Sequence, residues 1–269
     1  TNPQAIPFPP EDPMNPIWAI APALLSLAQP LAAAECSATS GRERVTLVEL
    51  FTSEGCNSCP PADRWLSSLI RAKSSGTVIP LAYHVDYWDS LGWRDRFAKP
   101  AFTARQEARQ RAGRWSFLYT PQVVLNGADF REWRGTTDPA HLARPDPARA
   151  EISLRTESRS PGAITAHVEV RVPEVSGPGR EGTVLHLALV ENGLVSEVSA
   201  GENAGRRLEH SAVVRDWVGP LALDGQGRIS AAHEFRRNDI DTRQASLVAI
   251  VETANRLELL QALRLDICP

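Results

Sequence analysis

Between residues 45 and 130, apolar segments of strand length alternate with segments of helical periodicity. The run 45–51 is rich in β-branched and large apolar residues, which predicts a buried strand. The next segment, 61–73, carries apolar residues on one face and predicts a helix. The other elements predicted here are a strand over 78–85, a helix over 95–113 with a break at Pro100, and a strand over 123–125 before an Asn-Gly turn. This alternation predicts an α/β layer with at least one parallel strand pair.

Beyond about residue 145 the pattern changes, and apolar and polar residues alternate with a period of two. The clearest example is 164–172, in which every second residue is apolar. A run over 184–190 enters the turn pair Asn192-Gly193 and returns over 194–198, which predicts a hairpin. Further strands are predicted over 149–156, 228–236 and 246–253. Short strands separated by Gly, Pro and Asn residues are typical of a β-sandwich.

The change of period predicts two domains, an α/β domain over 35–140 and an all-β, sandwich-like domain over 147–269. Proline and aspartate gather between them, over 136–147, and predict an exposed joint. The second domain carries no visible catalytic set, so we expect it to dock a protein partner or to act as a scaffold.

The first 34 residues resemble a signal peptide, because an apolar run over 17–34 ends in small residues before Glu35. Alternatives are a buried helix or a membrane anchor, and two internal prolines weaken a spanning helix. We therefore expect a periplasmic or secreted protein with no stable membrane span after processing.

The charge of the chain gives no reason to expect a nucleic-acid partner. Its 29 basic and 32 acidic residues leave a net charge of −3, and no basic stripe stands out. We expect no cofactor, and we expect the partners to be protein thiols or disulfides.

The motif that carries chemistry is Cys56-Asn57-Ser58-Cys59, between the first predicted strand and the first predicted helix. Two cysteines at this spacing can close a small disulfide ring, and a helix N-terminus favours a thiolate on Cys56. In thiol–disulfide exchange, that thiolate attacks and the second thiol resolves the mixed disulfide. Zinc sites use the same spacing, but they usually need a second pair of ligands, and no second CxxC or HxxxH occurs.

With the strand VTLVELF before it, a helix after it and the stretch Tyr119-Thr120-Pro121-Gln122 about 60 residues later, this motif resembles the thioredoxin superfamily. The resemblance implies a thioredoxin-like first domain. It also implies that Pro121 is a cis-proline facing the CxxC motif, with Thr120 as the neighbouring substrate contact. An ordinary trans proline opening a strand is the alternative.

Three segments, VELFTSEGCNSCPPAD, HVDYWDSLGW and GENAGRRLEHSAVVRDW (201–217), resemble more closely a family of secreted bacterial proteins catalogued as a domain of unknown function. This family implies a fold for most of 45–269 rather than an established reaction.

Two further sets of residues are candidates for the site. Glu49 lies near the position of the buried proton-shuttling acid of thioredoxin, and it is interpreted either as a proton acceptor for Cys59 or as a paired strand glutamate. His84, Asp86 and Trp88 lie at the C-terminal end of the second predicted strand, where α/β sheets place their sites, and we assign them to the rim. The other histidines carry no spacing signal: His141, His167, His186, His210 and His233.

The two remaining cysteines, Cys36 and Cys268, lie far apart in the chain. In an oxidising compartment an even cysteine count makes a structural disulfide between them a candidate, and two unpaired thiols are the alternative.

Two classes of function fit these residues. The first is a thiol–disulfide oxidoreductase that uses Cys56, Cys59 and Pro121. The second is a non-catalytic thioredoxin-like binding protein, or a copper chaperone, in which Cys56, Cys59 and His84 hold a soft metal such as Cu(I).

Overall fold

The computed structural model describes residues 34–72, 76–136, 138–144, 146–160, 162–173 and 182–268, together with residues 1 and 4. The predicted signal-peptide-like segment 1–34 lies outside the described residues, except for residues 1, 4 and 34.

The strands of the first half of the chain are β1 (Ala34–Thr39), β2 (Thr46–Thr52), β3 (Val78–His84), β4 (Gln122–Leu125) and β5 (Ala128–Asp129). Among the described residues, the α-helices are α1 (Pro60–Arg71) and α2 (Pro100–Gly113), and short 3₁₀ turns lie at Asp89–Leu91, Arg131–Gly135, Pro139–His141 and Thr242–Gln244. The strands of the second half are β6 (Glu151–Ser160), β7 (Ala163–Arg171), β8 (Thr183–Glu191), β9 (Leu194–Val198), β10 (Arg206–His210), β11 (Val213–Ala222), β12 (Arg228–Arg236), β13 (Ala245–Thr253) and β14 (Leu259–Asp266).

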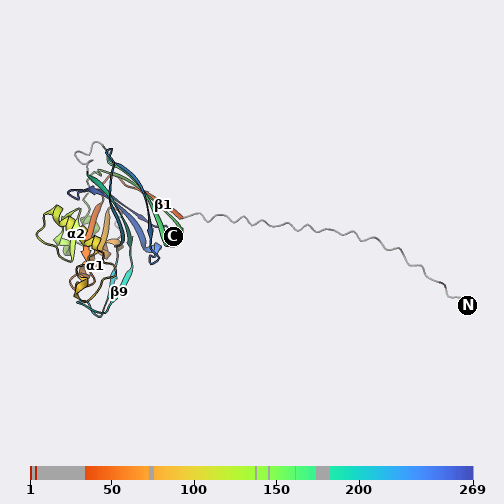
Figure 1. The fold of residues 1–269 in the computed structure, drawn as a ribbon, viewed down its shortest axis with the longest axis horizontal. Coiled ribbons are helices and arrows are strands. Elements are labelled where there is room, and N and C mark those ends of the chain that lie inside the picture. Colours follow the sequence, from red (N-terminus) through yellow and green to blue (C-terminus); the bar gives the residue numbers. More distant parts are fainter. Residues whose placement is uncertain are drawn as a thin grey trace. The chain divides into compact units, whose positions relative to one another are not determined.

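Strands from both halves of the chain form one eight-stranded sheet in the order β14-β13-β8-β11-β3-β2-β4-β5. The two halves join where β11 lies parallel to β3, and there the N–H of Ala82 donates to the carbonyl oxygen of Ala212 at 2.7 Å. Figure 1 shows the two α-helices together at one side of the strands.

The predicted fold class, an α/β thioredoxin-like domain followed by an all-β sandwich-like domain, is therefore wrong. The fold is mostly β, and strands predicted for a separate second domain continue the sheet that contains β2, β3 and β4. Periodicity identifies a strand but not its partner, which explains the error. The division between 140 and 147 stays a prediction, because strand pairing does not say which segments unfold together.

A second sheet, β1-β6-β7-β12, is antiparallel throughout. Its inward residues share a core with one face of β8 and β13, which includes Leu187 and Ala249. The opposite face of the same two strands, with Ala188 and Val248, belongs to the core that also holds α1 and α2 side chains. Because both faces of β8 and β13 are covered, most residues of these strands are apolar.

The predicted hairpin across Asn192-Gly193 does not form. β9 pairs with β10 in a separate two-stranded sheet, while β8 pairs with β11 and β13. The turn between β9 and β10, residues 199–205, is called the clamp turn below.

Candidate functional site

The loop between β2 and α1 carries the two cysteines of the CxxC motif as a disulfide. Their Cα atoms lie 5.4 Å apart. Cys56 is 1% exposed and Cys59 is 0% exposed, whereas Asn57 and Ser58 between them are exposed. This oxidised state therefore covers both sulfurs.

The start of α1 follows from the two prolines after Cys59. Proline has no N–H to leave unpaired and suits the first turn of a helix. Cys59 is the N-cap residue, and its carbonyl oxygen accepts the N–H groups of Ala62 at 2.8 Å and Asp63 at 3.2 Å. The disulfide therefore lies at the N-terminus of a helix that begins at Pro60, one residue earlier than predicted.

The peptide bond between Thr120 and Pro121 is cis, and Pro121 directly precedes β4. β4 pairs with β2, with Gln122 opposite Phe51 near the end of β2. This pairing brings the cis-proline to the edge of the sheet from which the CxxC loop departs.

A groove of about 320 Å³ runs beside the cis-proline. Its lining residues are mostly aromatic, hydroxylic or basic: Ser58, Phe117, Tyr119, Thr120, Pro121, Arg131, Trp133 and Arg134. The Ser58 hydroxyl lies 3.3 Å from Cys56 Sγ, so one end of the groove is at the disulfide. Phe117 is 58% exposed, which leaves an apolar contact surface open in the groove.

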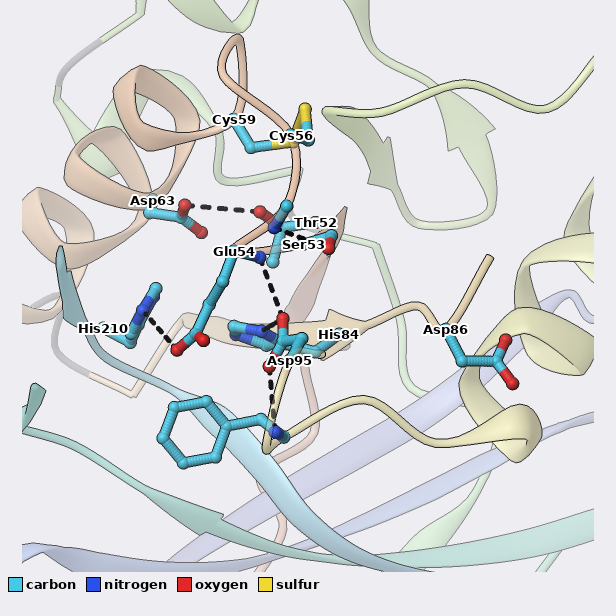
Figure 2. A network of polar contacts seen from close by, with 12 residues as sticks. Thr52, Ser53, Glu54, Cys56, Cys59, Asp63, His84, Asp86, Asp95 and His210 are labelled. Atoms are coloured by element: carbon cyan, nitrogen blue, oxygen red, sulfur yellow. Dashed lines mark hydrogen bonds and ion pairs between the residues drawn. A yellow bond between two sulfur atoms is a disulfide. The ribbon is translucent and has the colours of Figure 1, made fainter. Parts of the chain in front are cut away.

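Beneath the CxxC loop lies a buried acid–histidine network of Glu54, Asp63, His84, Asp95 and His210 (Figure 2). His84 Nδ1 lies 2.6 Å from Asp95 Oδ2, and His210 Nε2 lies 3.4 Å from Glu54 Oε1. The Glu54 N–H donates to Asp95 Oδ2 at 2.9 Å, which joins the two pairs. The Thr52 hydroxyl donates to Asp63 Oδ2 at 3.3 Å.

Burial and pairing shift the pKa values of this network in opposite directions. Burial raises the pKa of Asp63 above its usual range. Burial alone would lower the pKa of His84, but the charge and hydrogen bond of Asp95, together with the charges of Asp63 and Glu54, raise that pKa. The same contact lowers the pKa of Asp95 in spite of its burial. Asp63 is thus the carboxyl group of the network whose pKa is raised, whereas the pKa values of Glu54 and Asp95 are lowered.

Glu49 belongs to a different cluster. Its carboxylate lies 2.6 Å from Arg105 Nε and 2.7 Å from Arg109 Nη2, both on α2. The same two arginines pair with Glu252 of β13. These contacts match the interpretation of Glu49 as a paired strand glutamate.

The residues assigned to the rim separate into three environments. His84 is fully buried in the network. Asp86 accepts a hydrogen bond from the Thr103 hydroxyl at 2.5 Å and points away from the network (Figure 2). The Trp88 Nε1–H donates to the Thr120 hydroxyl at 2.8 Å, so Trp88 supports the residue before the cis-proline.

The clamp turn reaches the CxxC loop from the other half of the chain. The Asn203 side chain is fully buried, and its Nδ2 donates to the carbonyl oxygens of Glu54 at 2.8 Å and Cys56 at 3.0 Å. The Asn57 N–H donates to Glu202 Oε2 at 3.0 Å. Sequence reasoning assigned no role to Asp63, Asn203 or His210. The signal that could have found the last two is the family-like segment 201–217, which contains both.

Cys36 and Cys268 form a second disulfide, with Cα atoms 5.9 Å apart. It connects β1 to the residues after β14, across a sequence separation of 232. Cys36 Sγ also lies 3.0 Å from the Thr156 hydroxyl of β6.

Two further observations concern only the described part of the chain. Within it, no three His, Cys, Asp or Glu side chains are arranged to hold a metal ion, and His84 contacts Asp95 rather than a cysteine. None of its helices is long and apolar enough to cross a membrane.

The chain belongs to the family described as "Protein of unknown function (DUF1223)", whose model matches residues 47–252. This confirms the resemblance to a family of unknown function. The resemblance to the thioredoxin superfamily is not confirmed by the matches. No curated protein matches the chain.

Two solved structures are similar in fold. One is the crystal structure of an Agrobacterium tumefaciens structural-genomics target, 24% identical, with a TM-score of 0.54, covering 84% of this chain and 96% of that one. The other is HBP35 of Porphyromonas gingivalis, 14% identical, with a TM-score of 0.61, covering 85% of this chain and 76% of that one.

Proposed function

We propose that this protein is a thiol–disulfide oxidoreductase that works outside the cytoplasm on protein thiols or disulfides. The observation that carries the proposal is the Cys56–Cys59 disulfide at the start of α1, with a groove beside it that contains a cis-proline. A strand, a CxxC motif, a helix and a cis-proline are also the local features of the thioredoxin resemblance. The proposal uses these features alone and does not require the thioredoxin fold.

The reaction begins with the reduced protein. The Cys56 thiolate attacks one sulfur of a client disulfide, the client S–S bond breaks, and the departing client sulfur takes a proton. The Cys59 thiolate then attacks the Cys56 sulfur of the mixed disulfide and releases the second client thiol. Two electrons pass to the client, and the protein ends as the Cys56–Cys59 disulfide. A second redox partner restores the dithiol.

Asp63 is the residue we assign as the proton acceptor for Cys59. It lies one helical turn after Cys59, and its N–H donates to the Cys59 carbonyl oxygen. Burial raises its pKa, so its carboxylate takes a proton more readily than an ordinary aspartate does. Glu49, the earlier candidate for this role, is occupied by Arg105 and Arg109.

The groove supplies the client-binding surface. Pro121 has no N–H and therefore donates no backbone hydrogen bond at this position. The backbone of the neighbouring Thr120 is then available to form hydrogen bonds with an extended client segment. Phe117 and Tyr119 offer apolar and aromatic contacts in the same groove.

The proposed location outside the cytoplasm rests on the Cys36–Cys268 disulfide, which is separate from the CxxC pair. Structural disulfides persist in oxidising compartments and are rare in the cytosol.

The test is catalysed reduction of insulin disulfides, with glutathione as the reductant. The full chain should accelerate the reaction. Cys56→Ser should abolish the acceleration, and Pro121→Ala should weaken it. The matched control is the double variant Cys36→Ser, Cys268→Ser, which should keep the activity while it stays folded. No acceleration by a chain whose Cys56–Cys59 bond is shown to be reduced would overturn the proposal.

A further inference from the structure

The clamp turn is fitted closely to the CxxC loop. Gly201, at a φ of +71°, leaves room for Trp93, because a Cβ atom there would lie 3.1 Å from the Trp93 Cβ. The Trp93 Nε1–H in turn donates to Glu54 Oε2 at 2.8 Å. The turn, Trp93 and Glu54 therefore form one packed unit beneath the cysteines.

Glu202 is the exposed residue of this unit that touches the dithiol motif itself. Its carboxylate accepts the N–H of Asn57, the residue directly after Cys56. Backbone N–H groups beside a reactive cysteine are the donors that stabilise a thiolate. Here one such donor is already bound to a carboxylate, and that carboxylate adds a like charge beside the position of a Cys56 thiolate.

We propose that Glu202 is a positioning residue that sets the redox balance of the Cys56–Cys59 pair toward the disulfide. A disfavoured thiolate makes the dithiol less stable relative to the disulfide, so the reduced protein gives its electrons to clients more readily and the disulfide form takes electrons from them less readily. This inference rests on the proposed function, and it names a residue that favours the direction of electron flow given there.

Other charged groups also lie near the CxxC loop. Asp63 from α1 and Glu54 from the same loop are acidic, and both would act in the same direction as Glu202 when ionised. Arg131 and Arg134 line the groove that begins at Ser58 and act in the opposite direction. Arg131 is already paired with Asp129 at 2.8 Å. Of these groups, Glu202 has a direct hydrogen bond to the CxxC backbone and can be changed at an exposed position.

The experiment compares Glu202→Gln, Glu202→Asp and Glu202→Ala in the full chain. Gln removes the charge and keeps an acceptor for the Asn57 N–H, whereas Asp keeps the charge. The control is Glu169→Gln, the same chemical change at an exposed position of β7. Each variant is equilibrated with glutathione buffers of known composition. The alkylation rate of Cys56 is also measured against pH in the reduced protein.

Glu202→Gln should shift the equilibrium toward the dithiol by about threefold, which corresponds to about 15 mV, as expected for one screened charge bound to the residue after Cys56. The midpoint of its alkylation profile should fall by about half a pH unit. Glu202→Ala should shift both in the same direction, because it frees the N–H as well. Glu202→Asp should stay near the wild type.

The inference is overturned if Glu202→Gln matches Glu169→Gln in both measurements, or if either shift has the opposite sign. Both readouts are independent of client turnover. If the expected shifts occur but insulin reduction is not catalysed, only the proposed function is contradicted. If insulin reduction is catalysed but the shifts are absent, only this inference is contradicted.

Discussion

Replacement of Asn203 by alanine tests whether the clamp turn holds the CxxC loop in place. The substitution removes both donors of the buried side-chain amide, to the carbonyl oxygens of Glu54 and Cys56. The Cys56 carbonyl keeps a hydrogen bond from the Cys59 N–H at 3.2 Å, whereas the Glu54 carbonyl loses the only partner that the described residues provide. The substitution therefore affects the two carbonyls unequally.

A buried carbonyl left without a partner costs about 1–3 kcal/mol, and loss of a shared bond costs about 0.5–1 kcal/mol. We expect the free energy of unfolding to fall by about 2–3 kcal/mol. For a protein of this size that is a fall in Tm of roughly 4–12 °C. The measurement is urea and thermal unfolding of the oxidised protein, with Asn57→Ala as the exposed control.

A second readout separates local from global effects. Loosening of the loop should also speed reduction of the Cys56–Cys59 disulfide by a small phosphine, because both sulfurs are covered in the intact loop. If Asn203→Ala unfolds like Asn57→Ala and its disulfide is reduced at the wild-type rate, the clamp turn does not hold the loop.

Three further predictions concern other parts of the molecule. Because burial raises the folded-state pKa of Asp63, the contribution of Asp63 to stability falls as the pH rises above its unfolded-state pKa of about 4. In urea unfolding, Asp63→Asn should therefore be more stable than the wild type at pH 7 and equal to it below about pH 4. Equal stability at both pH values would contradict the raised pKa. Removal of the Cys36–Cys268 disulfide, which spans a sequence separation of 232, should lower the free energy of unfolding by about 2–4 kcal/mol. Removal of the Cys56–Cys59 disulfide, which spans a separation of 3, should lower it by less, and the reverse order would refute this prediction. Limited proteolysis should cut first between 136 and 147, and a first cut inside 45–130 would count against the predicted division.

Local elements followed from the sequence more closely than their partners did. β12 has the predicted bounds 228–236, because period-two alternation is a property of the segment itself. β11 was not predicted, because Arg215 and Asp216 interrupt the apolar pattern in the first half of the strand and Pro220 interrupts it in the second half. Arg215 is buried there in a pair with Glu191, a partner that periodicity cannot supply.

The same distinction holds for the site. Cys56, Cys59 and Pro121 were found because a motif and its spacing mark them. Asn203 and His210 were not, because their roles depend on contacts with residues about 150 positions away in the chain. Asp63 carried no mark in the sequence, because its raised pKa is a consequence of burial.

The central claim, that the CxxC pair exchanges with protein disulfides, is tested most directly by trapping. Cys59→Ser, with Cys36 and Cys268 also replaced by serine, is reduced, mixed with a disulfide-bonded client protein, and analysed by non-reducing mass spectrometry. The account predicts a mixed disulfide at Cys56 that accumulates because no resolving thiol remains. The comparison variant keeps Cys59 and carries Cys56→Ser with Cys36 and Cys268 replaced by serine, and it should trap far less client. Equal trapping by the two variants, or none by either, would contradict the account.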